Sequence, residues 1–146
     1  MERIVRKFCG KFWEDHIKNK NRKVSMKIYI DTNVYLDYLL ERKNKYGKDL
    51  SRPAFEVFKR TVACEFNILV SNHLIQELRG IIELNDLTVL MSFLKKKIIM
   101  IPDEIKGKGD ELHAQLAIKH GANLIVTRNI SHFKKFSIQS NTPEEL

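Results

Sequence analysis

The chain has few cysteines and no long hydrophobic run. Cys9 and Cys64 are its two cysteines, and they make neither a disulfide framework nor a zinc site. A reduced, cytoplasmic setting is therefore expected. No apolar run approaches the roughly 18 residues that would suggest a membrane span. Lys7, Lys11 and Glu14 interrupt the N-terminal apolar residues, so a secretory signal is not expected.

What the chain does have is enough apolar residues for one packed core. Its 146 residues fit a single domain, and 43% of them are hydrophobic, which is normal for a globular protein. The net charge is +8 and is unevenly distributed. Residues 1–25 hold 8 Lys and Arg against 3 Asp and Glu, whereas residues 26–146 hold 18 against 15. A basic surface attracts phosphate backbones without reading their sequence, although the same charge also suits an ordinary solvated surface.

Residues 1–25 are interpreted as a basic, amphipathic N-terminal extension, and residues 26–146 as the main domain. Apolar residues recur in the extension at helical spacing, and a polar, basic stretch over 18–25 follows as a linker. The apolar stripe is expected to pack on its own domain rather than on a partner. Because Met26 opens what reads as a complete domain, translation starting there is an alternative.

Strands and helices alternate after Met26. Apolar runs and helix-capping residues predict the strands and helices in turn. Expected strands span 27–30, 66–70, 98–101 and 123–126, with a fifth over 136–138; expected helices span 34–41, 54–63, 72–83, 85–94 and 110–120, the last ended by Gly121. This alternation predicts an α/β fold, a three-layer α/β/α sandwich around a parallel sheet of four to five strands.

Functional sites of such sheets lie at the carboxyl ends of the strands. Asp31 directly follows the first expected strand, at a helix N-terminus. A helix cap, stabilising by about 1 kcal/mol, explains Asp31 equally well when it is considered alone.

Glu77 projects from the apolar side of its helix, because its helical neighbours are Leu74, Leu78 and Ile81. An ionised carboxylate on a buried face is costly unless it is paired or binds a metal. The alternative is a buried salt bridge to an arginine.

Asp110 opens the last long helix and shares a face with the small residues Ala114 and Ala117. It is preferred as a ligand over Glu111, which aligns with Gln115. The alternative for Asp110 is a charge favoured by the helix dipole.

If the three acids meet, their mutual repulsion demands a cation, and carboxylate oxygens suit Mg²⁺ or Mn²⁺. Such ions activate water and stabilise charge on a phosphodiester, which makes metal-assisted hydrolysis the expected chemistry. Three basic residues could bind an RNA backbone: Arg128, Lys134 and Lys135. The alternative is that they form a solvated surface.

Four stretches of the chain resemble motifs of the PIN-domain family, especially its VapC-like toxin ribonucleases. They are Ile28-Tyr-Ile-Asp-Thr-Asn33, Ser71-Asn-His-Leu-Ile-Gln-Glu77, the helix from Asp110, and Thr127-Arg-Asn129 with the following His132-Phe133. The resemblance covers about residues 26–146 and leaves residues 1–25 outside the motifs.

The resemblance implies a site residue by residue. Asp31, Glu77 and Asp110 match the metal-binding, catalytic acids of the family. Asn129 falls where members often have a fourth acid, so one bound metal is favoured over two. The resemblance also implies supporting roles for two further residues, Thr127 and Asn33, and leaves Asp37 as an outer acid or a packing residue.

The resemblance further implies an endoribonuclease acting on single-stranded RNA, and, for VapC-like systems, a homodimer inhibited by a small antitoxin. An RNA-binding module of the same fold with little or no cleavage stays open as the alternative. A haloacid-dehalogenase-like phosphatase is disfavoured, because its Asp-x-Asp pair would need an acid at Asn33. A DNA-binding helix in residues 1–25 is also disfavoured, since a second recognition helix is lacking.

Overall fold

The computed structural model describes residues 26–146, and the predicted N-terminal extension lies outside the described residues. Five strands form one sheet in the order β3-β2-β1-β4-β5. All four neighbouring pairs are parallel. The strands are β1 (Met26–Ile30), β2 (Phe66–Ser71), β3 (Ile98–Ile101), β4 (Leu124–Val126) and β5 (Gln139–Asn141).

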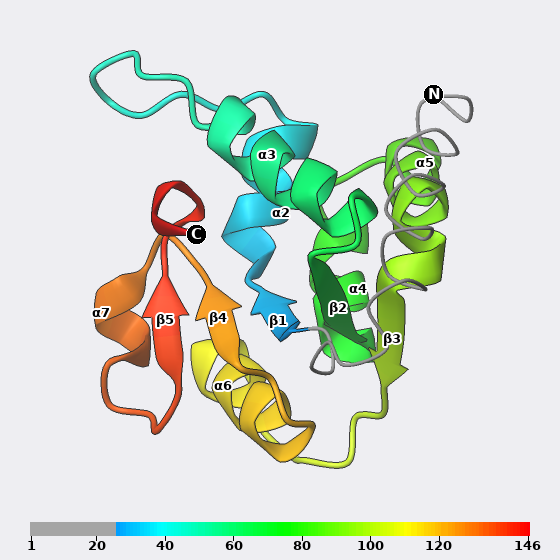
Figure 1. Cartoon of the computed structure of the whole chain (residues 1–146), viewed down its shortest axis with the longest axis vertical. Coiled ribbons are helices and arrows are strands. Elements are labelled where there is room, and N and C mark those ends of the chain that lie inside the picture. The colour runs from blue at the N-terminus through cyan, green and yellow to red at the C-terminus, as the bar shows by residue number, and fades with distance from the viewer. Residues whose placement is uncertain (1–25) are drawn as a thin grey trace, which may run out of the picture.

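Helices connect the strands and cover both faces of the sheet (Figure 1). They are α2 (Thr32–Leu39), α3 (Ser51–Val62), α4 (Asn72–Arg79), α5 (Leu84–Leu94), α6 (Gly109–Lys119) and α7 (Ile130–Phe133), with short 3-10 turns η1 (Lys95–Lys97) and η2 (Pro143–Glu145). Every parallel crossover needs such a connection, which is why helices separate the strands in the sequence.

Two apolar cores lie on the two faces of the sheet. Ile28 and Ile30 of β1 point to the larger core, which α2, α3, α4 and α5 close. Tyr29, the residue between them, points to the smaller core under α6 and α7. Successive side chains of a strand alternate between faces, so a strand buried on both sides reads as an unbroken apolar run. The predicted three-layer parallel α/β architecture is confirmed.

Two element predictions need correction. The fifth strand is Gln139–Asn141 rather than 136–138, because Phe136 and Ile138 pack against the smaller core while the polar residues pair with β4. The helix expected over 72–83 ends at Arg79, and Gly80 caps it. Ile81 therefore does not extend the apolar face of α4 and is 57% exposed.

Register places the ends of β1 and β4 side by side. Ile30 pairs with Val126, and the Asp31 amide donates to the Val126 carbonyl at 2.9 Å. The residues that follow these two strands, Asp31 and Thr127, are therefore neighbours at the carboxyl edge of the sheet. α4 begins at the same edge because β2, which neighbours β1, runs directly into it.

Candidate metal site

Asp31 stands at the centre of this edge and is only 3% exposed. Its carboxylate accepts hydrogen bonds from the Thr127 hydroxyl at 2.8 Å and from the Thr32 amide at 2.7 Å. Burial raises the pKa of Asp31 above its ordinary range, and the nearby charge of Asp110 raises it further, while Thr127 and His113 act in the opposite direction. Asp31 is thus a fixed carboxylate whose charge the protein compensates incompletely.

Glu77 reaches the same edge from α4 and is half-buried. The Thr32 hydroxyl donates to its carboxylate at 2.5 Å, so the residue after Asp31 bridges the two acids. His73 Nε2 lies 2.7 Å from one Glu77 oxygen, and His113 Nε2 lies 3.1 Å from the other. Burial raises the pKa of Glu77, but the Thr32 hydrogen bond and His113 outweigh it and leave that pKa below its ordinary value.

Glu77 therefore has partners other than the arginine that the salt-bridge alternative supposed. Among the described residues, its ion-pair partners are the two histidines. Histidine carries a charge only when it is protonated, so these contacts do not replace a permanent cation.

Asp110 lies in the first turn of α6 and is half-buried. One of its oxygens is 2.6 Å from His132 Nδ1 of α7, and its charge contributes to the raised pKa of Asp31. Ala114 and Ala117 are fully buried on the same helix, as their small size predicted. Glu111 is exposed and accepts a hydrogen bond from Gln115. The structure thus brings Asp31, Glu77 and Asp110 to one edge and leaves Glu111 outside.

The other predicted site residues differ in how closely they approach Asp31. Thr127 is fully buried and contacts Asp31 directly. The amide of Asn129 donates to the Thr127 hydroxyl at 3.0 Å, and the residue itself is exposed. The Asn33 side chain accepts a hydrogen bond from the Arg128 amide at 3.4 Å. The roles of Asn129 and Asn33 at a metal stay predictions.

Arg128 is held by the protein rather than presented to solvent. Its guanidinium donates to Asp37 at 2.6 Å and to Glu144 at 2.7 and 2.9 Å, and its side chain is 19% exposed. Arg42 is a second partner of Asp37, at 2.9 Å. Asp37 thus belongs to an arginine cluster, and an RNA-steering role for Arg128 would have to break these contacts.

Lys134 and Lys135 are both exposed. They follow α7, whose His132 contacts Asp110, and the Lys135 ammonium lies over the Phe136 ring. Contact with RNA at these two lysines stays a prediction.

Sequence reasoning missed His73 and His113. His73 stands four residues before Glu77 on α4, and His113 stands three residues after Asp110 on α6. Both spacings place a histidine on the same helix face as the acid, which is the signal that could have found them. Tyr29 was also missed, because an apolar strand residue gave no hint that its hydroxyl holds His113 at 2.6 Å.

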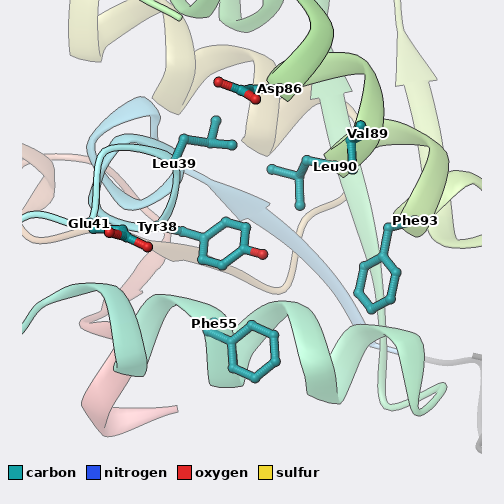
Figure 2. Close-up of a pocket in the computed structure, with 8 residues that line it drawn as sticks. All are labelled: Tyr38, Leu39, Glu41, Phe55, Asp86, Val89, Leu90 and Phe93. Carbon is teal, nitrogen blue, oxygen red and sulfur yellow. The ribbon is translucent and has the colours of Figure 1, made fainter. Parts of the chain in front are cut away.

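A large hollow elsewhere in the described structure is apolar and lies apart from these acids. It has a volume of about 500 Å³ and lies between α2, α3 and α5 (Figure 2). Its lining residues are Tyr38, Leu39, Glu41, Phe55, Asp86, Val89, Leu90 and Phe93. Since these include none of Asp31, Glu77 and Asp110, this groove is separate from the candidate metal site.

Comparisons with known proteins give one weak similarity. No family model matches the chain, and no curated protein matches it. A solved structure described as "Structure of the PIN domain endonuclease Utp24" is similar over 73% of each chain, with 19% identity and a TM-score of 0.46. No helix in residues 26–146 is long and apolar enough to cross a membrane.

Proposed function

We propose that this chain is a metal-dependent endoribonuclease that hydrolyses phosphodiester bonds of single-stranded RNA, with Asp31, Glu77 and Asp110 as its metal-binding acids. The observation that carries the proposal is the position of three carboxylates at one edge of the sheet, where Thr32 joins Asp31 to Glu77 and the charge of Asp110 acts on Asp31. Within residues 26–146, no Lys or Arg forms an ion pair with any of the three.

The donor set fits a divalent cation. Three carboxylates bring three negative charges together, and their repulsion favours a cation between them. Oxygen ligands of this kind suit Mg²⁺ and Mn²⁺. Asn129 would supply at most a neutral amide oxygen in the fourth place, which favours one bound ion over two.

The metal, when bound, supplies an activated water and stabilises the charge that develops on the phosphate. The chain's own residues keep the acids in place for it. Thr127 and the Thr32 amide fix the Asp31 carboxylate, and the Thr32 hydroxyl fixes Glu77. Lys134 and Lys135 attract the phosphate backbone without reading its sequence.

The substrate and the biological role rest on the resemblance to PIN-domain ribonucleases. That resemblance supports single-stranded RNA as substrate and, in its VapC-like form, a cytoplasmic toxin that forms a homodimer and is inhibited by a small antitoxin. A neighbouring antitoxin gene and growth arrest on expression are the expected outcomes. An isolated gene whose expression is harmless would contradict the toxin role while leaving the ribonuclease proposal intact.

An RNA-binding module with little or no cleavage is the second candidate. The neutral Asn129 and the captured guanidinium of Arg128 favour it, because both reduce what the site offers to a reacting phosphate. Metal-dependent cleavage distinguishes the two candidates, since a binding module retains RNA without cutting it.

The test is cleavage of single-stranded RNA by the purified full chain with Mn²⁺ or Mg²⁺. Asp31→Asn and Asp110→Asn are expected to lower the rate by about three orders of magnitude, since several kcal/mol of charge stabilisation is lost. Glu111→Gln is the matched control, because Glu111 is adjacent to Asp110 but exposed and outside the cluster. Circular dichroism establishes that each variant is folded.

Equal cleavage by wild type and Asp31→Asn would contradict the proposal, as would cleavage that persists in excess chelator. RNA retention without cleavage by the wild type, at any metal concentration, would favour the binding module instead.

A further inference from the structure

His73, Glu77 and His113 form a compact set of potential ligands. One ligand atom from each residue lies within 4.8 Å of the other two. The two imidazole rings are themselves neighbours, with centroids 4.8 Å apart and planes tilted by 48°. Two nitrogen donors and one carboxylate therefore face a common point, which the acids Asp31 and Asp110 do not share.

His113 is held from behind in the way that a metal-binding histidine usually is. The residue is 1% exposed, and its Nδ1 lies 2.6 Å from the Tyr29 hydroxyl. Tyr29 in turn contacts the Ser71 hydroxyl at 2.8 Å, and Ser71 accepts a hydrogen bond from the Leu74 amide. Such outer partners fix the ring and direct its second nitrogen toward the ligand position.

The hydrogen-bond chain can run in either direction. With Tyr29 donating to Nδ1, His113 Nε2 carries the proton and donates to Glu77 at 3.1 Å. With Nδ1 donating to Tyr29 and Tyr29 donating to Ser71, Nε2 instead presents a lone pair toward Glu77 and His73. The second arrangement leaves the Nε2 lone pair beside the Glu77 carboxylate, with the Thr32 hydroxyl 3.5 Å away, and such a lone pair can bind a cation.

We propose that His73, Glu77 and His113 bind a transition-metal cation, for which Zn²⁺ is the best fit. Imidazole nitrogens suit Zn²⁺, whereas Mg²⁺ takes oxygen ligands and retains its waters. Two histidines and one glutamate are a known zinc ligand set, and three protein ligands leave a fourth position open for water.

Zn²⁺ binding requires a modest rearrangement of these three side chains. Zn²⁺ bonds to nitrogen at about 2.0 Å, so tetrahedral ligands lie about 3.3 Å apart. Glu77 is already 2.7 and 3.1 Å from the two histidines, and the remaining distance is at most 4.8 Å. His73 is the side chain that can move to close it, since it is 19% exposed while His113 is buried.

The inference rests on the proposed function only in sharing Glu77, because Zn²⁺ binding is measured without RNA. The full chain is stripped with a chelator and titrated with Zn²⁺ against a chromophoric indicator. His73→Ala and His113→Gln are each expected to weaken Zn²⁺ binding more than tenfold. Tyr29→Phe removes only the hydrogen-bond partner of His113, so it is expected to weaken Zn²⁺ binding by a smaller factor, roughly tenfold.

The matched control is His120→Gln. His120 caps the end of α6, seven residues beyond His113, and is expected to leave the Zn²⁺ affinity unchanged. Circular dichroism detects whether His113→Gln, a change at a buried residue, prevents folding. In that case His73→Ala still tests the site, because His73 is only half-buried. Visible absorption of bound Co²⁺, which reports nitrogen ligation in a four-coordinate site, should appear in the wild type and disappear in His73→Ala.

Equal Zn²⁺ affinity in wild type and His73→Ala would overturn the inference, as would Mg²⁺ binding as tightly as Zn²⁺ at this set. Asp31→Asn separates the two proposals, since it is expected to lose cleavage and keep Zn²⁺. Zn²⁺ binding without any ribonuclease activity would contradict the proposed function but not this inference. Cleavage without Zn²⁺ binding would contradict this inference but not the proposed function.

Discussion

Asp31 and Asp37 are two acids of almost equal burial whose charges are treated in opposite ways. They lie six residues apart, and their exposed fractions are 3% and 1%. Asp37 has two guanidinium partners, Arg42 at 2.9 Å and Arg128 at 2.6 Å. Asp31 has a hydroxyl and an amide. A buried carboxylate is stable when it is paired, and Asp37 meets that condition within the chain.

The surroundings extend this contrast. Arg42 contacts Asp37, and Arg128 contacts both Asp37 and Glu144, so two acids balance two arginines and the arginine cluster is neutral. The acid edge of Asp31, Glu77 and Asp110 carries three negative charges against histidines that are charged only when protonated. The arginine cluster is therefore paired within the chain, and the difference supports the proposal that the acid edge binds a cation from solution.

The largest expected effect on stability comes from replacing each of the two acids by asparagine, which should affect Asp37 more than Asp31. Asp37→Asn is expected to lower the free energy of unfolding by about 3 kcal/mol, because it leaves the guanidinium groups without their buried charge partner. Asp31→Asn should change it by less than about 1 kcal/mol in metal-free protein, since the amide can keep its contacts with Thr127 and Thr32. Urea denaturation of both variants measures the difference.

Wild-type stability in Asp37→Asn would show that the arginine cluster contributes little to the fold. A loss of unfolding free energy in Asp31→Asn as large as that in Asp37→Asn would remove the contrast between the two acids that supports the proposed metal site. Either result is independent of any activity assay.

Metal addition should stabilise the protein through Asp31. A ligand that binds only the folded state stabilises it by about 2.7 kcal/mol at 100 times its dissociation constant. Mn²⁺ at that excess is expected to raise the urea midpoint of the wild type and of the control Glu111→Gln. Asp31→Asn should lose most of this increase, and an equal increase in that variant would place the ion elsewhere.

The sequence predicts the position of the acids better than it predicts their surroundings. An apolar run followed by Asp31 indicates the end of a buried strand, because strand periodicity and burial are local properties. Two partners of Glu77 are not local: His113 is 36 residues away and Thr32 is 45 residues away, so these contacts depend on how the elements pack across the sheet.

The fifth strand shows the same limit at a smaller scale. Apolar residues over 136–138 suggested a buried strand, but Phe136 packs against Phe133 and the polar Gln139–Asn141 forms the edge. An edge strand gains its place from pairing with a neighbour rather than from hydrophobicity, so its pattern was absent from the local sequence. The capture of Arg128 by Asp37, 91 residues away, was hidden for a similar reason.

The smallest expected effect tests the outer end of the arginine cluster by pH. Burial raises the pKa of Glu144, but the Arg128 guanidinium outweighs it and holds that pKa below the ordinary value of 4.5. A lowered pKa in the folded state means that Glu144 stabilises the protein above about pH 4.5, and that this contribution is lost as the pH falls through the folded pKa.

The contribution of Glu144 to the free energy of unfolding should stay below about 1 kcal/mol, because the Glu144 side chain is 32% exposed. Glu144→Gln should therefore lower the urea midpoint at about pH 6 and approach the wild type as the pH falls through the folded pKa, where the carboxylate becomes protonated. A gap between the two proteins that does not change over this interval would mean that Glu144 acts through packing, and the charge balance of the arginine cluster would then rest on Asp37 alone.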